Sequence, residues 1–124
     1  MKPLLLATFG LLLGTSTAMA HMLDGRWAFF AEACTAEYTD ATFTVNIADG
    51  EIRYWESGCN LGQITTIGEW DEVWRSALTC SGEGETWTTD TIFGLQQGFD
   101  GTADRLVQID LNDGFVMIAV RCGK

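Results

Sequence analysis

The chain has 124 residues, of which 17 are acidic and 7 are basic, and its formal net charge at pH 7 is −10. This balance excludes the usual nucleic-acid binder, which needs a basic face, and it argues against adsorption to anionic lipid. Because 47% of the residues are hydrophobic and 11% are aromatic, the composition does not fit a disordered acidic tail.

The first 20 residues have the pattern of an export signal. After a basic second residue, an apolar stretch covers residues 4–13, and Ala18-Met19-Ala20 is a small-x-small cleavage site. We therefore expect a signal peptide over residues 1–20 and a single domain over residues 21–124, located in the periplasm or secreted. Cleavage would remove one lysine and no acid, so the mature net charge would be −11. No other apolar run approaches the length of a membrane span.

The first half of the mature chain consists of short extended segments joined by tight turns. Phe43, Val45 and Ile47 alternate with polar residues, which is the period of a half-buried strand. Asp49-Gly50 follows directly and is a strong hairpin signal. Over residues 69–77, the spacing of the apolar side chains fits a short helix as well as a strand and loop.

The second half continues the same pattern. Ser81-Gly82-Glu83-Gly84 joins two extended segments, and four threonines flank Trp87 in a way that suits a half-exposed strand. Asn112-Asp113-Gly114 is a further hairpin signal before the last segment. We expect up to eight strands, close to residues 26–34, 41–48, 51–57, 61–67, 72–80, 85–93, 105–111 and 115–122.

Short strands joined by tight turns predict an all-β fold, arranged as a barrel or a sandwich. Closure into a barrel removes the exposed strand edges that such a chain would otherwise present. We therefore expect a small antiparallel meander that closes into a barrel of about eight strands, with an interior that side chains can fill.

The mature chain has four cysteines: Cys34, Cys59, Cys80 and Cys122. In an exported chain this even set predicts two disulfides, and the gaps of 25, 21 and 42 residues do not fit a zinc site. Of the three possible connectivities we favour Cys34–Cys59 with Cys80–Cys122. In a strict meander the first three cysteines share one rim, so we expect a break near Trp70-Asp71 or residues 96–104, or a tail that turns back.

Two short motifs stand at the ends of the domain. Gly25-Arg26-Trp27 opens it, and Arg121 lies on the last expected strand. This pairing resembles the calycin superfamily of small antiparallel barrels, in which lipocalins carry a Gly-x-Trp on the first strand and a basic residue on the last. The resemblance implies that Trp27 closes the barrel floor and that Arg121 lies against its face, a contact that contributes roughly 0.5–2 kcal/mol.

The sequence contains no complete catalytic constellation. His21 is the only histidine and no Gly-x-Ser-x-Gly is present, so we expect no enzyme activity. Pairs such as Glu83 and Glu85 fit acid-rich turns as well as a glycosidase. His21 would offer copper an α-amine and an imidazole, but a second histidine is lacking, and residues 100–104 lack the acid ladder of a calcium loop. We expect neither a metal nor a cofactor.

The tryptophans suggest where a partner would bind. There are five: Trp27, Trp55, Trp70, Trp74 and Trp87. We expect Trp27 in the core, with Trp87 as a second core candidate. Trp55, Trp70 and Trp74 either cap the barrel ends or form a partner-binding surface, because exposed aromatic side chains anchor interfaces.

These observations predict a non-enzymatic binding protein that acts on a basic protein, for example as its inhibitor, since a net charge of −11 would speed encounter with a cationic partner. In size and acidity the chain resembles the bacterial lysozyme inhibitors, which are exported barrels. One alternative is a lipocalin-like carrier of a small apolar ligand. Another is a structural envelope protein without a ligand, whose acidity serves only solubility.

Overall fold

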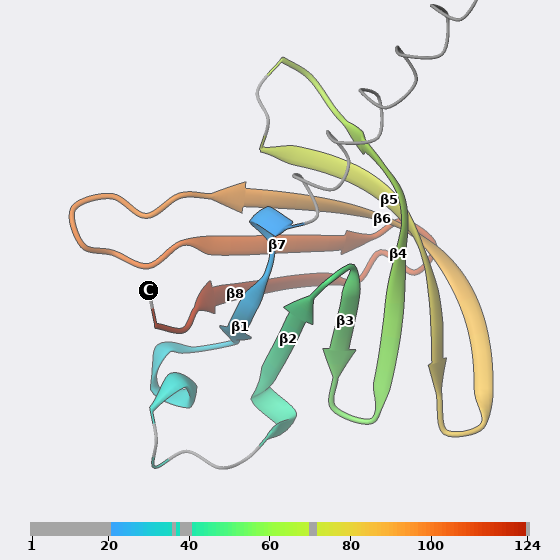
Figure 1. The fold of residues 1–124 in the computed structure, drawn as a ribbon, viewed down its shortest axis with the longest axis horizontal. Helices are drawn as coiled ribbons and strands as arrows, with labels where there is room; N and C mark the ends of the chain where they lie inside the picture. The colour runs from blue at the N-terminus through green and yellow to red at the C-terminus, as the bar shows by residue number, and fades with distance from the viewer. Residues whose placement is uncertain (1–20, 36, 38–40, 70–71, 124) are drawn as a thin grey trace, which may run out of the picture.

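Eight antiparallel strands follow one another around a closed barrel, and the last strand pairs with the first (Figure 1). The computed structural model describes residues 21–35, 37, 41–69 and 72–123, so the expected signal peptide, residues 1–20, lies outside the described residues. The strands are β1 (Gly25–Ala28), β2 (Thr44–Ala48), β3 (Glu51–Tyr54), β4 (Ser57–Thr66), β5 (Val73–Gly82), β6 (Glu85–Gln96), β7 (Arg105–Asp110) and β8 (Val116–Arg121). The predicted all-β meander is confirmed, and its architecture is consistent with a calycin-like barrel.

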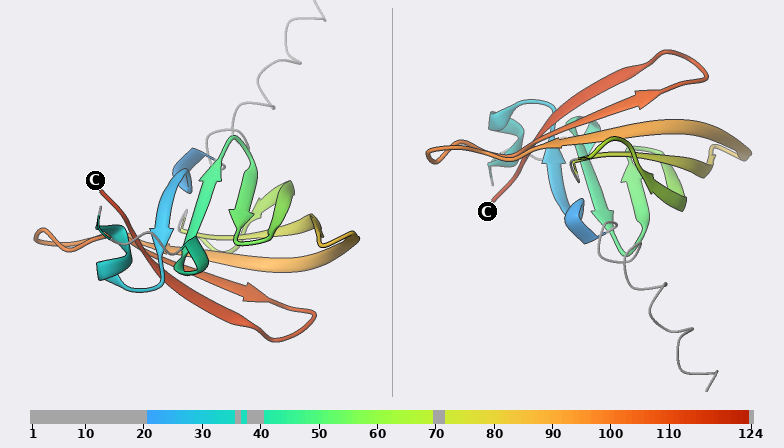
Figure 2. Two further views of the ribbon diagram at one scale, coloured as in Figure 1. Left: turned by 90° about the horizontal axis from the view of Figure 1, so that it is seen from below. Right: turned by 90° about the horizontal axis from the view of Figure 1, so that it is seen from above.

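The strands differ strongly in length. β4, β5 and β6 have 10 to 12 residues, whereas β1, β2 and β3 have only 4 or 5. The β5–β6 hairpin therefore projects beyond its neighbours, as Figure 2 shows. Its tip is exposed on one rim of the barrel because the pairing of β6 with β7 ends at Thr91 and Asp110.

Alternation along the strands fills the interior. On β5, for example, Trp74, Ser76, Leu78 and Cys80 are buried, and the residues between them are exposed. Buried side chains from all eight strands join one cluster, which includes Trp27. The core of this small barrel is therefore made of packed side chains.

One polar contact crosses the interior. The Tyr54 hydroxyl on β3 donates to Gln108 Oε1 on β7 at 2.9 Å. Burial raises the pKa of Tyr54 to about 12, because the phenolate would lose its hydration there. This hydrogen bond lets two polar side chains lie within the barrel without leaving that pair unsatisfied.

The chain leaves the barrel earlier than the pattern over residues 26–34 predicts. β1 ends at Ala28, and Ala31–Cys34 form a short 3-10 helix. The backbone N–H of Phe29 donates to the carbonyl oxygen of Phe43 at 3.0 Å, and the Phe29 and Phe43 rings meet edge to face. Residues 41–43 are also a 3-10 turn rather than the start of a strand, so β2 begins only at Thr44. The contacts between Phe29 and Phe43 therefore join the end of β1 to the start of β2.

The helical alternative for residues 69–77 is wrong from Val73 onwards, where β5 begins. Trp70 and Asp71 lie outside the described residues. The expected break over residues 96–104 is a loop between β6 and β7 that leaves the strand order unchanged.

All four cysteines are paired, but the connectivity that we favoured is wrong. The disulfides join Cys34 to Cys122 and Cys59 to Cys80. Cys59 on β4 and Cys80 on β5 are direct register partners, so this bridge links adjacent strands. Cys59 and Cys80 do share a rim, as expected, whereas Cys34 lies in a 3-10 helix beyond β1 and not at the end of a strand.

The 3-10 helix brings Cys34 to Cys122. The backbone N–H of Cys122 donates to the carbonyl oxygen of Arg26 at 2.7 Å. The guanidinium of Arg26 in turn donates to the carbonyl oxygen of Ala33 at 3.2 Å. The chain therefore turns back after β1, and this turn, not a break in the meander, joins the two ends of the domain.

The pairing makes a direct prediction. Because Cys34 and Cys122 are 88 residues apart, replacing both with alanine should lower the free energy of unfolding by about 4–5 kcal/mol. Urea unfolding measures this loss. As a control, the Cys59→Ala, Cys80→Ala variant should keep the Cys34–Cys122 peptide in a non-reducing digest. Recovery of a Cys34–Cys59 peptide from the native protein would contradict the structure.

Candidate functional site

Arg121 on β8 joins the last strand to the segment that leads into the first. Its guanidinium carbon lies 4.3 Å from the centroid of the Trp27 ring. Nη1 donates to the carbonyl oxygen of Asp24 at 2.6 Å, and Nη2 donates to that of Met22 at 3.1 Å. Nε donates to the carboxylate of Asp104 at 3.0 Å. The structure thus places Arg121 over the buried Trp27, where the resemblance puts it.

A glycine is needed beneath this arginine. Gly25 has a φ of +146°, and a Cβ there would lie 2.8 Å from Nη1 of Arg121. Any other residue would be strained and would also displace the guanidinium from its place. This gives the Gly-x-Trp motif a physical reason in this chain.

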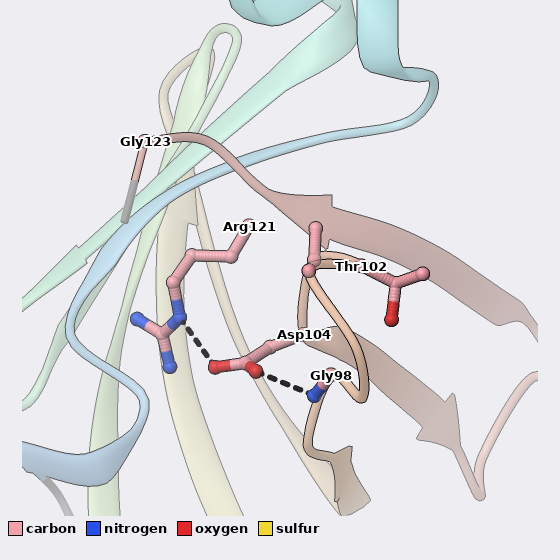
Figure 3. A pocket seen from close by; sticks show the side chains of 7 residues that line it. Gly98, Thr102, Asp104, Arg121 and Gly123 are labelled. Carbon is pink, nitrogen blue, oxygen red and sulfur yellow. Dashed lines mark hydrogen bonds and ion pairs between the residues drawn. The ribbon is translucent and has the colours of Figure 1, made fainter.

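A hollow of about 750 Å³ opens beside this arginine (Figure 3). It is lined by Gly98, Gly101, Thr102, Ala103, Asp104, Arg121 and Gly123. Asp104 accepts hydrogen bonds from the Gly98 N–H at 2.7 Å and from Arg121, so its charge is paired with that of the arginine. We infer that Asp104 and Arg121 stabilise the β6–β7 loop and the closure of the barrel and do not bind a ligand.

The tips of two hairpins form the candidate site on the opposite rim. The β3–β4 turn carries Trp55 and Glu56, and the β5–β6 turn carries Glu83; both turns lie at the lower edge of Figure 1. A hollow of about 280 Å³, here called the hairpin-tip site, is lined by Trp55, Glu56, Ser57, Gly82, Glu83, Glu85 and Trp87. Trp55 is 54% exposed and Trp87 is 42% exposed. Two half-exposed indoles and three carboxylates thus share one concave surface.

A close backbone approach holds the two tips together. A Cβ at Gly82 would lie 2.8 Å from the carbonyl oxygen of Glu56 and 2.8 Å from Cβ of Ser57. Only glycine allows this contact without a shift of one hairpin. The geometry of the site therefore depends on Gly82.

Two glutamates of the site occupy an unusual backbone conformation. Glu56 has a φ of 72° and Glu83 a φ of 52°, in the left-handed region that favours glycine or asparagine. A hydrogen bond with Glu83 raises the pKa of Glu56 above its usual range, and desolvation and the negative charge of Glu83 raise it further. The turns thus hold two like charges together, and a bound cation would relieve their repulsion.

A second hollow of about 400 Å³ continues this surface and shares Glu56 and Ser57 with it. It adds Glu51 and Arg53, whose side chains approach to 3.6 Å. The carboxylates therefore extend beyond the hairpin-tip site along the outside of β3.

Of the two predicted partner-binding tryptophans that the structure describes, Trp55 is exposed and Trp74 is not. Trp74 is 1% exposed and lies opposite Phe93 in the core, so its assignment to a partner-binding surface is wrong. Trp70 lies outside the described residues. Trp87, which we considered for the core, is instead part of the site.

The register and length of the strands explain why Trp74 is buried and Trp87 is exposed. Trp87 is opposite Cys80, so it occupies an inward-facing position on β6. However, β7 pairs with β6 only from Thr91 onwards, so the barrel wall beside Trp87 is missing. One sequence signal could have identified Trp87 as a site residue. It lies two residues after Glu85, at the end of a turn that carries Glu83.

No family model, curated protein or solved structure matches this chain. Within the described part of the chain, no helix has both the length and the apolar character needed to cross a membrane.

A third cluster lies on the rim that carries Arg121. Potential ligand atoms of His21, Asp24 and Asp49 all lie within 4.8 Å of one another. His21 Nδ1 is 2.8 Å from Asp24 Oδ2, and this hydrogen bond raises the pKa of the imidazole. An exposed ion pair accounts for this geometry, so we assign no metal to it. The sequence offered no signal that Asp24 and Asp49 would meet His21.

The closure can be tested by stability. Trp27→Ala should lower the free energy of unfolding by about 3–5 kcal/mol, as for other large-to-small core changes. Arg121→Ala should cost about 2–3 kcal/mol through the lost hydrogen bonds and cation–π contact. Arg53→Ala, at an exposed site, is the control and should change stability by less than about 0.5 kcal/mol. Urea unfolding that ranked Arg121 with Arg53 would contradict the closure role.

The carboxylate pair can be tested by titration. Glu83→Gln should lower the pKa of Glu56 toward its usual value, since it removes the carboxylate that hydrogen-bonds to Glu56 and, with it, a neighbouring negative charge. In the wild type, the folded state holds this proton more tightly than the unfolded state. The contribution of Glu56 to stability should therefore fall as the pH rises through its raised pKa. Carbon-13 NMR titration of the Glu56 side chain measures the shift, with Asp100→Asn as the control that should leave it unchanged.

Proposed function

We propose that this protein is an exported, non-enzymatic binding protein that captures a basic protein through the hairpin-tip site. The observation that carries the proposal is the shared hollow, in which Trp55 and Trp87 are half-exposed beside Glu56, Glu83 and Glu85. An indole face attracts a cation, and a carboxylate forms charge-assisted hydrogen bonds with lysine or arginine. The site thus combines the two interactions that suit a basic side chain.

The lining of the site supports a protein partner over a small apolar ligand. Three carboxylates line the hollow of about 280 Å³, whereas sites for small apolar ligands are lined mainly by hydrophobic side chains. A hollow of this kind suits one basic side chain that projects from a larger surface. Support for a small-ligand carrier is weaker, because side chains from all eight strands meet in the buried cluster that occupies the core.

The rest of the chain is compatible with this role. Two disulfides suit an oxidising compartment, as does the export signal that we expect over residues 1–20. The mature net charge of −11 would steer a cationic partner toward the molecule. If the partner is an enzyme, a barrel seated on its basic surface would act as an inhibitor by covering it.

Surface capture on immobilised mature protein tests the proposal. The probes are a panel of basic proteins, including lysozyme, and acidic proteins of similar size. Association should be fastest for basic proteins at low salt. Raising ionic strength from about 0.05 to 0.5 M shortens the screening length from roughly 14 to 4 Å, so the association rate should fall several-fold. Capture of none of the basic proteins, or salt-independent capture, would contradict the proposal.

Paired variants separate the site from the overall charge. Trp87→Ala should raise the dissociation rate by about 30-fold, the equivalent of roughly 2 kcal/mol at an interface anchor. Phe99→Ala is its control, since Phe99 is 77% exposed and belongs to the loop between β6 and β7. Glu83→Gln should slow association more than Asp100→Asn, which also removes one charge from a residue with positive φ. Equal effects in both pairs would place the contact elsewhere.

A further inference from the structure

The outward face of the last hairpin is apolar, which is unusual for the exterior of a barrel in water. On β7 the outward residues include Val107 and Ile109, and on β8 they are Val116, Ile118 and Val120. Val107 is opposite Ile118, and Ile109 is opposite Val116, so the side chains form cross-strand pairs. Val116 is 53% exposed and Ile118 is 54% exposed. We call these five residues the β7–β8 face.

The apolar row continues into the turn of the hairpin. Leu111 follows Ile109 by two residues on the same side and is 44% exposed, and Phe115 at the other end of the turn is 58% exposed. The long strand β5 has a different exterior, because its outward positions include Arg75, Thr79 and Ser81. In both views of Figure 2 the hairpin lies at the margin of the molecule, and no other described strand lies beyond it. Contiguous apolar surface of this kind marks an interaction site.

The distribution of charge favours a second copy of this chain as the partner of this face. The β7–β8 face contains no acid, although the full sequence has a net charge of −10, so two copies can meet here without opposing carboxylates across the face. Opposite charges lie at its two ends, with Arg105 at the start of β7 and Asp113 in the turn. A two-fold axis in the plane of the face and perpendicular to the strands would bring Arg105 of one copy to Asp113 of the other.

We propose that two copies of this protein pack face to face through the β7–β8 face, with their hairpins antiparallel. The apolar side chains of the face on one copy then pack against those of the other copy. Two Arg105–Asp113 pairs fix the orientation. The face spans roughly 20 Å along the strands, which is small for a stable interface, so we expect a dissociation constant in the micromolar range. The hairpin-tip site is formed by other hairpins.

Salt separates this association from capture of a basic partner. Burial of apolar surface between two molecules of like charge should strengthen as salt screens their mutual repulsion. The association rate at the hairpin-tip site should fall under the same conditions. The two proposals therefore fail independently, because each predicts its own response to ionic strength.

Sedimentation of the full mature protein tests the dimer. At 5–200 µM, the wild type should shift from monomer to dimer, and the shift should occur at lower concentration in 0.5 M than in 0.05 M salt. Ile118→Lys should raise the dissociation constant at least 30-fold. Its control is Thr79→Lys, which adds the same charge to an exposed outward position on β5 and should leave the dimer intact. Circular dichroism and urea unfolding check that both variants fold.

A charge swap tests the orientation. Arg105→Glu and Asp113→Arg should each weaken the dimer about three-fold to ten-fold, and the double variant should recover most of the loss. A wild type that stays monomeric at 200 µM in high salt would overturn the proposal, as would a dimer that survives Ile118→Lys. A monomer that instead floats with neutral phosphatidylcholine vesicles would assign the face to lipid and also overturn it. A double variant that recovers nothing would overturn the antiparallel arrangement.

Discussion

The contact between Arg121 and Trp27 lies at the seam where the barrel closes. Only two register pairs join β1 to β8, Trp27 with Arg121 and Ala28 with Val120, so the backbone ladder there is short. The guanidinium strengthens this seam through the indole face and through carbonyl oxygens of the segment before β1. Without closure, β1 and β8 would present unpaired edges, which are sites for pairing with other chains. One side chain on the last strand therefore supports the sheet as a continuous surface.

The unequal lengths of the strands, short in β1 to β3 and long in β4 to β6, create the hairpin-tip site. The long β5–β6 hairpin exceeds the pairing available from β7, and this is why an inward-facing indole such as Trp87 becomes exposed at the tip. Gly82 then lets the shorter β3–β4 turn approach that tip. The candidate site is thus a product of unequal strand lengths, and the core beneath it remains packed.

Local patterns predicted most of the fold. Asp49-Gly50 and Glu83-Gly84 are hairpin turns whose residues have positive φ, and such signals depend only on neighbouring residues. Period-two alternation likewise located β2, because this strand has one buried face. The barrel follows from these local features together with the need to remove strand edges.

What sequence could not predict depends on where strands end relative to their neighbours. Trp74 and Trp87 both occupy inward positions, yet only the first is covered, since coverage depends on the length of β7. The disulfide pairing failed for a related reason, because the pattern did not show that β1 ends at Ala28 and turns back toward Cys122. Likewise, Glu56 and Glu83 are 27 residues apart, and only the meeting of two turns makes them one site.

The position of Arg121 on β8, the last of the eight barrel strands, also imposes an order on folding. The Cys59–Cys80 bridge and the hairpins from β3 to β6 join segments that are close in sequence. They can therefore form before the later strands β7 and β8 are available for pairing. Closure and the Cys34–Cys122 bridge require β8, the last strand to arrive. Until then β1 lacks its β8 partner, and that edge is open to pairing with other chains. We therefore expect the chain to be most prone to aggregation at the stage of folding at which β1 is formed and β8 has not yet paired with it.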